Sequence, residues 1–183
     1  ANLYSEHDQV DDAVQVLRDA ETQFPNNTQV LFQLGAVFER GQRYPEAEAA
    51  FRRVLEREPD DAQTLNYLGY MLAERNERLD ESVELIQRAL ELDPDNGSYL
   101  DSLGWAYFKK DELDLAETAL RRAGDQLLRN SVVQDHLADL LFKIERYAEA
   151  VTAWERALAG DRDGVDVSGI ERKLGDARAR LRR

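Results

Sequence analysis

The chain has 183 residues, of which 33% are charged and 43% belong to the hydrophobic set. This apolar content is too high for a disordered chain, and the absence of cysteine excludes disulfides, thiolate zinc sites and a cysteine nucleophile. The net charge of −13 makes a polyanion such as DNA an unfavourable partner. No apolar run has the roughly 18 residues that a membrane span needs. Charge is uneven, because residues 171–183 carry +4 and the preceding residues −17.

From Thr28 onward, one pattern of residues returns at a nearly constant interval. The steps between its marker pairs are 34, 35 and 34 residues, and the pairs are Leu34-Gly35, Leu68-Gly69, Leu103-Gly104 and Leu137-Ala138. Each pair is followed by a small residue and, four positions later, by a large apolar one. These are Ala47 and Phe51, Ser82 and Ile86, Ala116 and Leu120, and Ala150 and Trp154. The interval predicts a repeat of two helices.

Each position of the repeat has a physical reason. Leu31, Leu34 and Phe38 recur at helical spacing and form one apolar face. Gly35 lies on that face, where a mid-helix glycine costs about 1 kcal/mol in propensity and is useful only if another helix approaches closely. Pro59 cannot continue a helix and closes the unit. A single helical pair cannot bury its apolar face alone, so neighbouring pairs are expected to stack.

The pattern changes at both ends and once in between. Residues 1–27, closed by Pro25, match only the second half of a unit, so we expect a piece of a longer protein that could have lost a signal peptide or lipid anchor. At Leu128, where a proline is expected, the sequence predicts either an altered or longer helix end or a degenerate linker without consequence. Ile170 and Leu174 belong to an apolar stripe that predicts a terminal capping helix.

This pattern resembles the tetratricopeptide repeat (TPR), a helix–turn–helix unit of 34 residues. The resemblance implies an all-α fold, a right-handed superhelical solenoid of antiparallel helix pairs. Its expected parts are a partial unit at 1–27, complete units at 28–61, 62–96, 97–130 and 131–164, and a capping helix at 165–183. More narrowly, the segment from Leu65 to Phe108 resembles bacterial TPR proteins of the cell envelope, which favours the bacterial periplasm over the cytoplasm.

The chain shows no pattern typical of an enzyme. It contains no phosphate-binding glycine loop, no HExxH and no EF-hand loop. His136 with Asp135 and Asp139 could hold a metal in principle, but ligands on one exposed helix make a weak site, and a solvated groove histidine is the better interpretation. We therefore expect neither catalytic residues, nor a metal, nor a cofactor.

The TPR resemblance implies a binding surface on the concave side, formed by the first helix of each unit. The positions expected to face it hold Phe32, Asn66, Tyr70, Asp101, Trp105, Phe108, Asp135, Asp139 and Phe142. Phe108 and Phe142 can equally be buried against the adjacent repeat, whereas Tyr70 and Trp105 are expected to face the groove. Exposed aromatic side chains typically mark interaction sites, and the acids beside them favour a ligand with apolar groups and a positive charge.

Two functions are consistent with these residues. The first is a non-catalytic scaffold or adaptor that binds a protein or peptide segment in its concave groove, with no nucleic acid and no membrane span. The alternative is a self-association module that builds a homo-oligomer through the unpaired first helix or the capping helix. The sequence does not name the partner.

Overall fold

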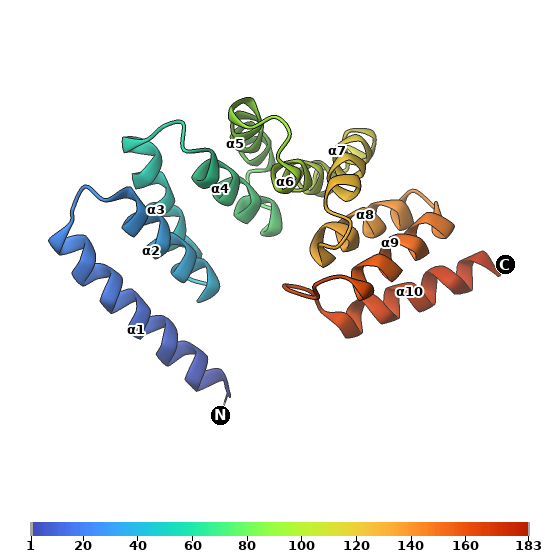
Figure 1. Cartoon of the computed structure of the whole chain (residues 1–183), viewed down its shortest axis with the longest axis horizontal. Helices are drawn as coiled ribbons and strands as arrows, with labels where there is room; N and C mark the ends of the chain where they lie inside the picture. The colour runs from blue at the N-terminus through green and yellow to red at the C-terminus, as the bar shows by residue number, and fades with distance from the viewer. Residues whose placement is uncertain (1, 183) are drawn as a thin grey trace.

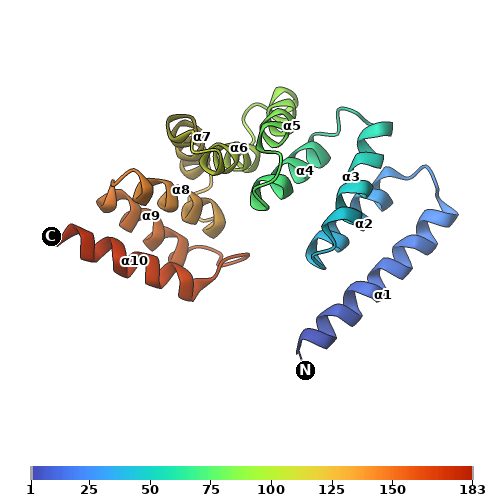
Figure 2. The same cartoon turned by 180° about the vertical axis from the view of Figure 1, so that it is seen from behind.

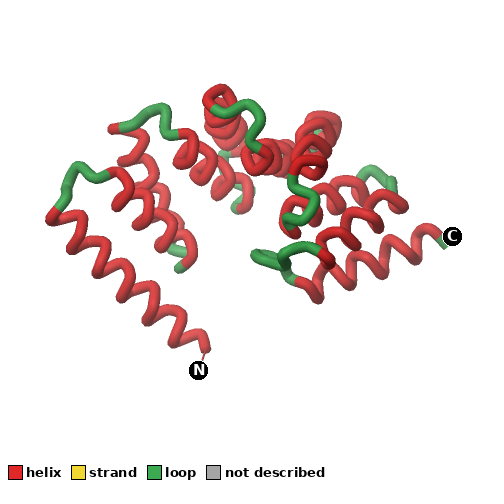
Figure 3. Tube along the Cα trace, in the orientation of Figure 1, coloured by secondary structure: helices red, strands yellow, loops and turns green. Residues whose placement is uncertain are grey.

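The computed structural model describes residues 2–182, and the side chains of residues 10–182. Within the described residues the chain is helical throughout, with short loops and no strand (Figure 3). The ten helices are α1 (Asn2–Gln23), α2 (Thr28–Arg40), α3 (Tyr44–Arg57), α4 (Ala62–Glu74), α5 (Leu79–Leu92), α6 (Gly97–Lys109), α7 (Leu113–Gln126), α8 (Ser131–Lys143), α9 (Tyr147–Ala159) and α10 (Val167–Leu181).

The helices follow an arc, with α1 and α10 at its two ends and α5 and α7 on its outer side (Figures 1 and 2). Short turns join α2 to α3, α4 to α5, α6 to α7 and α8 to α9 as antiparallel pairs. Helix α4 packs on α6, and α6 contacts α8, so the first helices of these three pairs are neighbours. None of the helices described is both long and apolar enough to cross a membrane.

Local sequence explains where the helices begin. The first helix of each pair starts after an Asn or Asp whose side chain accepts a backbone N–H from the first turn, namely Asn27, Asp61, Asn96 and Asn130. Three of the turns within pairs have three residues, and the α4–α5 turn has four. The additional length places both Asn76 and Arg78 in the left-handed region, and Arg78 then reaches back to Glu48 at 2.5 Å.

The close approach expected at the repeat glycines is present. A Cβ added to Gly35 would lie 2.5 Å from Cε1 of Phe51, and one added to Gly104 would lie 2.5 Å from Cγ of Leu120. Both distances are shorter than any ordinary carbon contact, so a larger residue would force the two helices of a pair apart. In the α8–α9 pair Ala138 takes this position and is fully buried.

The prediction of a longer helix end near Leu128 is wrong. Helix α7 ends at Gln126 and has 14 residues, as α3 and α5 do. Leu128 is an exposed residue of a short linker, so the alternative of a degenerate linker describes this segment. At the C-terminus, Ile170 and Leu174 of α10 pack into the core with Trp154 of α9, as the apolar stripe predicts.

Candidate functional site

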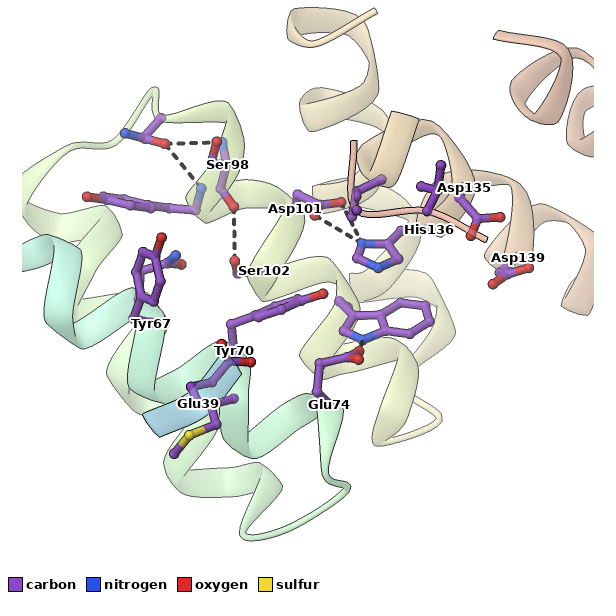
Figure 4. A pocket seen from close by; sticks show the side chains of 18 of the residues that line it. Glu39, Tyr67, Tyr70, Glu74, Ser98, Asp101, Ser102, Asp135, His136 and Asp139 are labelled. Carbon is purple, nitrogen blue, oxygen red and sulfur yellow. Dashed lines mark hydrogen bonds and ion pairs between the residues drawn. The ribbon is translucent and has the colours of Figure 1, made fainter. Parts of the chain in front are cut away.

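The inner side of the arc holds a groove of about 880 Å³. We call the surface from α2 and α4 the first wall, with Glu39, Asn66, Tyr67, Tyr70 and Glu74. The second wall comes from α8, α10 and the loop before α10, and includes Asp135, Asp139 and Lys173. The floor between them comes from α6, with Tyr99, Asp101 and Trp105. Helices far apart in sequence therefore contribute to one cavity, because the repeats curve around it (Figure 4).

The structure brings six of the nine expected site residues to this groove: Asn66, Tyr70, Asp101, Trp105, Asp135 and Asp139. The other three, Phe32, Phe108 and Phe142, do not line it. Phe32 of α2 is buried against the neighbouring helices. Its ring centroid lies 5.7 Å from that of Phe51 and 5.0 Å from that of Tyr67.

Phe108 and Phe142 are both half-buried behind the groove. The Phe108 ring stacks on Trp105 at 5.0 Å, and the Phe142 ring lies 5.7 Å from Trp154. An aromatic ring at these repeat positions gains more contact from the adjacent helix than from water, which is why these rings pack inward.

The floor is organised around a buried histidine. Nδ1–H of His136 donates to the Asp101 carboxylate at 3.0 Å, and the imidazole stacks on the Trp105 ring with 4.0 Å between centroids. Burial alone would lower the pKa of His136, but the charge and hydrogen bond of Asp101 outweigh it and raise the pKa. His136 is buried, so the expectation of a solvated histidine is wrong.

Trp105 belongs to the same cluster and has only 8% of its surface exposed. Its indole N–H donates to the Glu74 carboxylate of the first wall, and Lys109 lies over its ring at 4.8 Å from the centroid. The residue therefore offers little open aromatic surface. It connects the floor to the first wall instead.

The acids of the second wall have an internal cation. Nζ of Lys173 lies 2.7 Å from Asp139 and 3.0 Å from Asp135, which also accepts the Trp154 indole N–H at 2.7 Å. Burial and the neighbouring Asp135 raise the pKa of Asp139, while Lys173 opposes that rise. Burial tends to lower the pKa of Lys173, but its two aspartates raise it overall, so the ammonium stays charged.

The acids of the first wall are arranged differently. Glu39 lies beside Tyr70, and the Glu74 carboxylate reaches the Trp105 indole N–H, while the Tyr70 ring points across the groove toward His136 (Figure 4). Burial raises the pKa of the Tyr70 phenol, and the charges of Glu74, Asp101 and Glu39 raise it further. Among the side chains of residues 10–182, no lysine or arginine forms an ion pair with Glu39 or Glu74. Burial raises the pKa of Glu39, and the charge of the neighbouring Arg40 opposes that rise.

The nine expected site residues left out several residues that line the groove, among them Tyr67, Tyr99, Lys173 and the glutamates Glu39 and Glu74. Tyr67 is 43% exposed and Tyr99 is half-buried, so with Tyr70 they supply the accessible aromatic surface of the groove. For Tyr67 and Tyr99, the only sequence feature that could have indicated a groove residue was a tyrosine at a repeat position not expected to face the groove. Lys173 carries no signal, because its ion pairs join residues more than 30 positions apart. In the described part of the chain, no group of three His, Asp or Glu side chains could hold a metal ion.

Comparison with known proteins agrees with this geometry. The sequence pattern of the tetratricopeptide repeat family matches residues 1–62, 40–97 and 71–126. A TPR repeat-containing protein of Pseudomonas aeruginosa is 34% identical over 74 residues, which are 40% of this chain and 12% of that protein. The chain thus spans about an eighth of the length of this relative.

Several solved structures share the fold at low sequence identity. The type IV pilus biogenesis factor PilW has a TM-score of 0.78 and 20% identity, over 98% of this chain and 84% of its own. A thermophilic TPR protein of Thermus thermophilus gives 0.75 and 19%, over 96% and 93%. PilF of Pseudomonas aeruginosa gives 0.73 and 20%, over 97% and 85%.

The helix pairs, their close packing and the concave groove define a helical repeat scaffold. The chain belongs to the tetratricopeptide repeat family. Proteins of this family are generally non-catalytic scaffolds, and the fold implies that the partners of this chain are proteins.

Proposed function

We propose that this chain is a non-catalytic adaptor that binds a segment of a partner protein in its concave groove. The observation that supports the proposal is the groove itself. Its volume of about 880 Å³ is in the range of known ligand-binding pockets. Its floor and first wall offer the rings of Tyr67, Tyr70 and Tyr99 together with charged groups. Tyrosine is enriched at interfaces because one end is apolar and the other forms hydrogen bonds.

Within this proposal, the bound segment lies along six of the expected residues: Asn66, Tyr70, Asp101, Trp105, Asp135 and Asp139. Of these, Trp105 acts mainly by joining the floor to the first wall. Phe32, Phe108 and Phe142 act from behind, by holding Tyr67, Trp105 and Trp154 in place. The resemblance of Leu65–Phe108 to cell-envelope proteins, and the fold shared with a pilus biogenesis factor, support a place in the bacterial cell envelope.

The test is selection of peptides from a random display library on the wild-type protein, followed by affinity measurements on variants. Tyr67→Ala combined with Tyr99→Ala removes accessible rings from the first wall and the floor. Loss of a central interface aromatic typically weakens binding about 30-fold. The matched control is Tyr107→Ala, because this half-buried tyrosine of α6 lines a separate hollow near Leu90 and Leu115. Peptides that bind the wild type and the Tyr67/Tyr99 double variant equally would place the binding site outside the groove.

Self-association is a second candidate function. Two large apolar side chains are accessible at this end of the array, Val16 of α1 at 67% exposure and Phe24, the residue after α1, at 58%. An exposed apolar surface on a terminal helix can pair with a second copy. Light scattering over a wide concentration range tests this function, with Val16→Asp as the variant. A mass that stays monomeric at every concentration contradicts it.

A further inference from the structure

The second helices of neighbouring pairs are joined by an ion-pair motif that recurs along the array. Between α3 and α5, Arg52 bridges Glu48 and Glu81 at 2.7 Å each, and Arg78 also binds Glu48. The α7–α9 junction repeats this arrangement with the four equivalent side chains, Glu117, Arg121, Arg146 and Glu149. At both junctions, charged side chains therefore connect one second helix to the next.

The junction between them, from α5 to α7, breaks the motif. Its four equivalent positions hold Val83, Gln87, Glu112 and Leu115. Gln87 donates to the Tyr107 hydroxyl at 2.9 Å, and Leu115 leaves 49% of its surface exposed. In the other three pairs a glutamate stands at the position of Leu115, namely Glu46, Glu81 and Glu149. An exposed apolar side chain thus replaces a charged one at this junction alone.

An apolar hollow of about 290 Å³ opens where the motif is broken. Its lining includes Leu90 of α5, Leu103 and Tyr107 of α6, and Leu115 of α7. The ion pair that remains at this junction, Lys110 with Asp80, lies outside the hollow. No residue lines both the hollow and the concave groove, so the two cavities are separate surfaces of the chain.

The charge and size of the hollow define what it can hold. Its one charged lining residue is Arg122, whose only ion pair among the described side chains is with Asp95, at 3.4 Å. Asp95 is 89% exposed, and such an exposed pair contributes little, so the guanidinium is available to a carboxylate. A stable interface between two copies buries roughly 800 Å² on each partner, far more than this hollow offers. Its volume, at the lower end of ligand pockets, suits one large apolar side chain.

We propose that this hollow is a second docking site, for a segment of a partner protein that inserts a leucine or phenylalanine between α5 and α7. An aspartate or glutamate of the same segment lies beside Arg122. The inference goes beyond the proposed function of the groove and does not depend on it. The groove is lined mainly by acids, whereas the hollow presents an arginine, so the two sites select segments of opposite charge.

The test is a selection from a random peptide display library on immobilised wild-type protein, with excess soluble Leu115→Gln protein present. The soluble variant captures peptides for the groove and every other surface, so peptides that need the hollow remain on the wild type. Glutamine suits this position, because other pairs carry glutamate there, and it leaves the net charge unchanged. The matched control is Leu128→Gln, at a linker leucine that is 50% exposed.

We expect the selected peptides to share a leucine or phenylalanine with an acidic residue close to it. They should bind Leu115→Gln about tenfold more weakly than the wild type, as is typical of losing a central interface contact, and Leu128→Gln equally well. Arg122→Gln should weaken them about threefold, and should not affect peptides whose acid is replaced by its amide. Leu115→Gln should unfold at the same urea concentration as the wild type.

Four results would overturn the inference. If the selection enriches no peptide over the starting library, the hollow has no such ligand, and the adaptor function of the groove still stands. Peptides that lack a shared acid, or that ignore Arg122→Gln, contradict the proposed partner chemistry. A wild-type dimer that Leu115→Gln converts to a monomer would assign the hollow to a second copy. A lower unfolding midpoint for Leu115→Gln would mean that Leu115 serves the fold.

Discussion

The two walls of the groove carry similar acidic side chains and differ in what faces them. On the second wall, Asp135 and Asp139 share Lys173, a residue of the terminal helix α10. On the first wall, Glu39 and Glu74 meet Tyr70 and the Trp105 indole, and no described lysine or arginine pairs with them. A count of acids would treat the walls as equal. One lysine from a distant helix neutralises the acids of the second wall. The acids of the first wall have no such ion pair and remain open to a partner.

The largest effect is expected from removing the floor that both walls share. Trp105→Ala deletes a buried ring that contacts His136 and Phe108, so it should lower the free energy of unfolding by about 3–5 kcal/mol. Tyr67→Ala, at a more exposed ring of the first wall, should cost less than about 1 kcal/mol. Chemical denaturation of both variants measures the difference. Similar losses would mean that Trp105 is not packed between the walls.

The next effect concerns the spacing of the helices that carry the walls. Gly104→Ala places a Cβ 2.5 Å from Cγ and 3.0 Å from the backbone nitrogen of Leu120, so it should destabilise the fold by about 1–3 kcal/mol. Gly175→Ala is the control, since no atom lies within 4 Å of its added Cβ. That variant should be stabilised by about 0.5–1 kcal/mol, because alanine favours a helix. Thermal unfolding should move the two variants in opposite directions.

A smaller effect should come from opening the second wall. Lys173→Met leaves Asp135 and Asp139 without their cation and should cost about 1 kcal/mol, a modest value because the lysine side chain is 38% exposed and screened by water. Arg172→Met, at an outward residue, should change little. The comparison is made by urea unfolding at low and at high salt. If Lys173→Met matched Arg172→Met under both conditions, the walls would not differ as described.

The smallest effect is a pH dependence that originates in the floor. Since the folded-state pKa of His136 lies above its usual 6.5, the protonated imidazole stabilises the fold. That contribution is complete below 6.5 and is lost as pH rises through the raised value, at less than about 1.4 kcal/mol per pH unit. His136→Gln should flatten the profile of unfolding free energy above pH 6. An unchanged slope in this variant would show that another group is responsible.

Most of the helical framework could be predicted because it depends on neighbours in the sequence. The interval between glycines, the apolar faces and the turn-forming prolines are local patterns, and the close contacts at Gly35 and Gly104 have the predicted cause. Six of nine site residues also reach the groove for this reason. The prediction failed where a side chain chooses between water and the next repeat, as at Phe32 and His136. That choice depends on curvature, which the repeat interval does not encode.

The sequence by itself determined the repeat, the all-helical fold and the helix faces that turn inward. Helical periodicity and steric contact within one unit involve residues that are close in sequence, so these patterns can be recognised from the sequence alone. Only the tertiary structure decided which carboxylates are neutralised. His136 reaches Asp101 across 35 positions, and Lys173 reaches Asp135 across 38. Pairings of this range are fixed by how successive repeats stack, so the charge that a partner would meet is a property of the assembled groove.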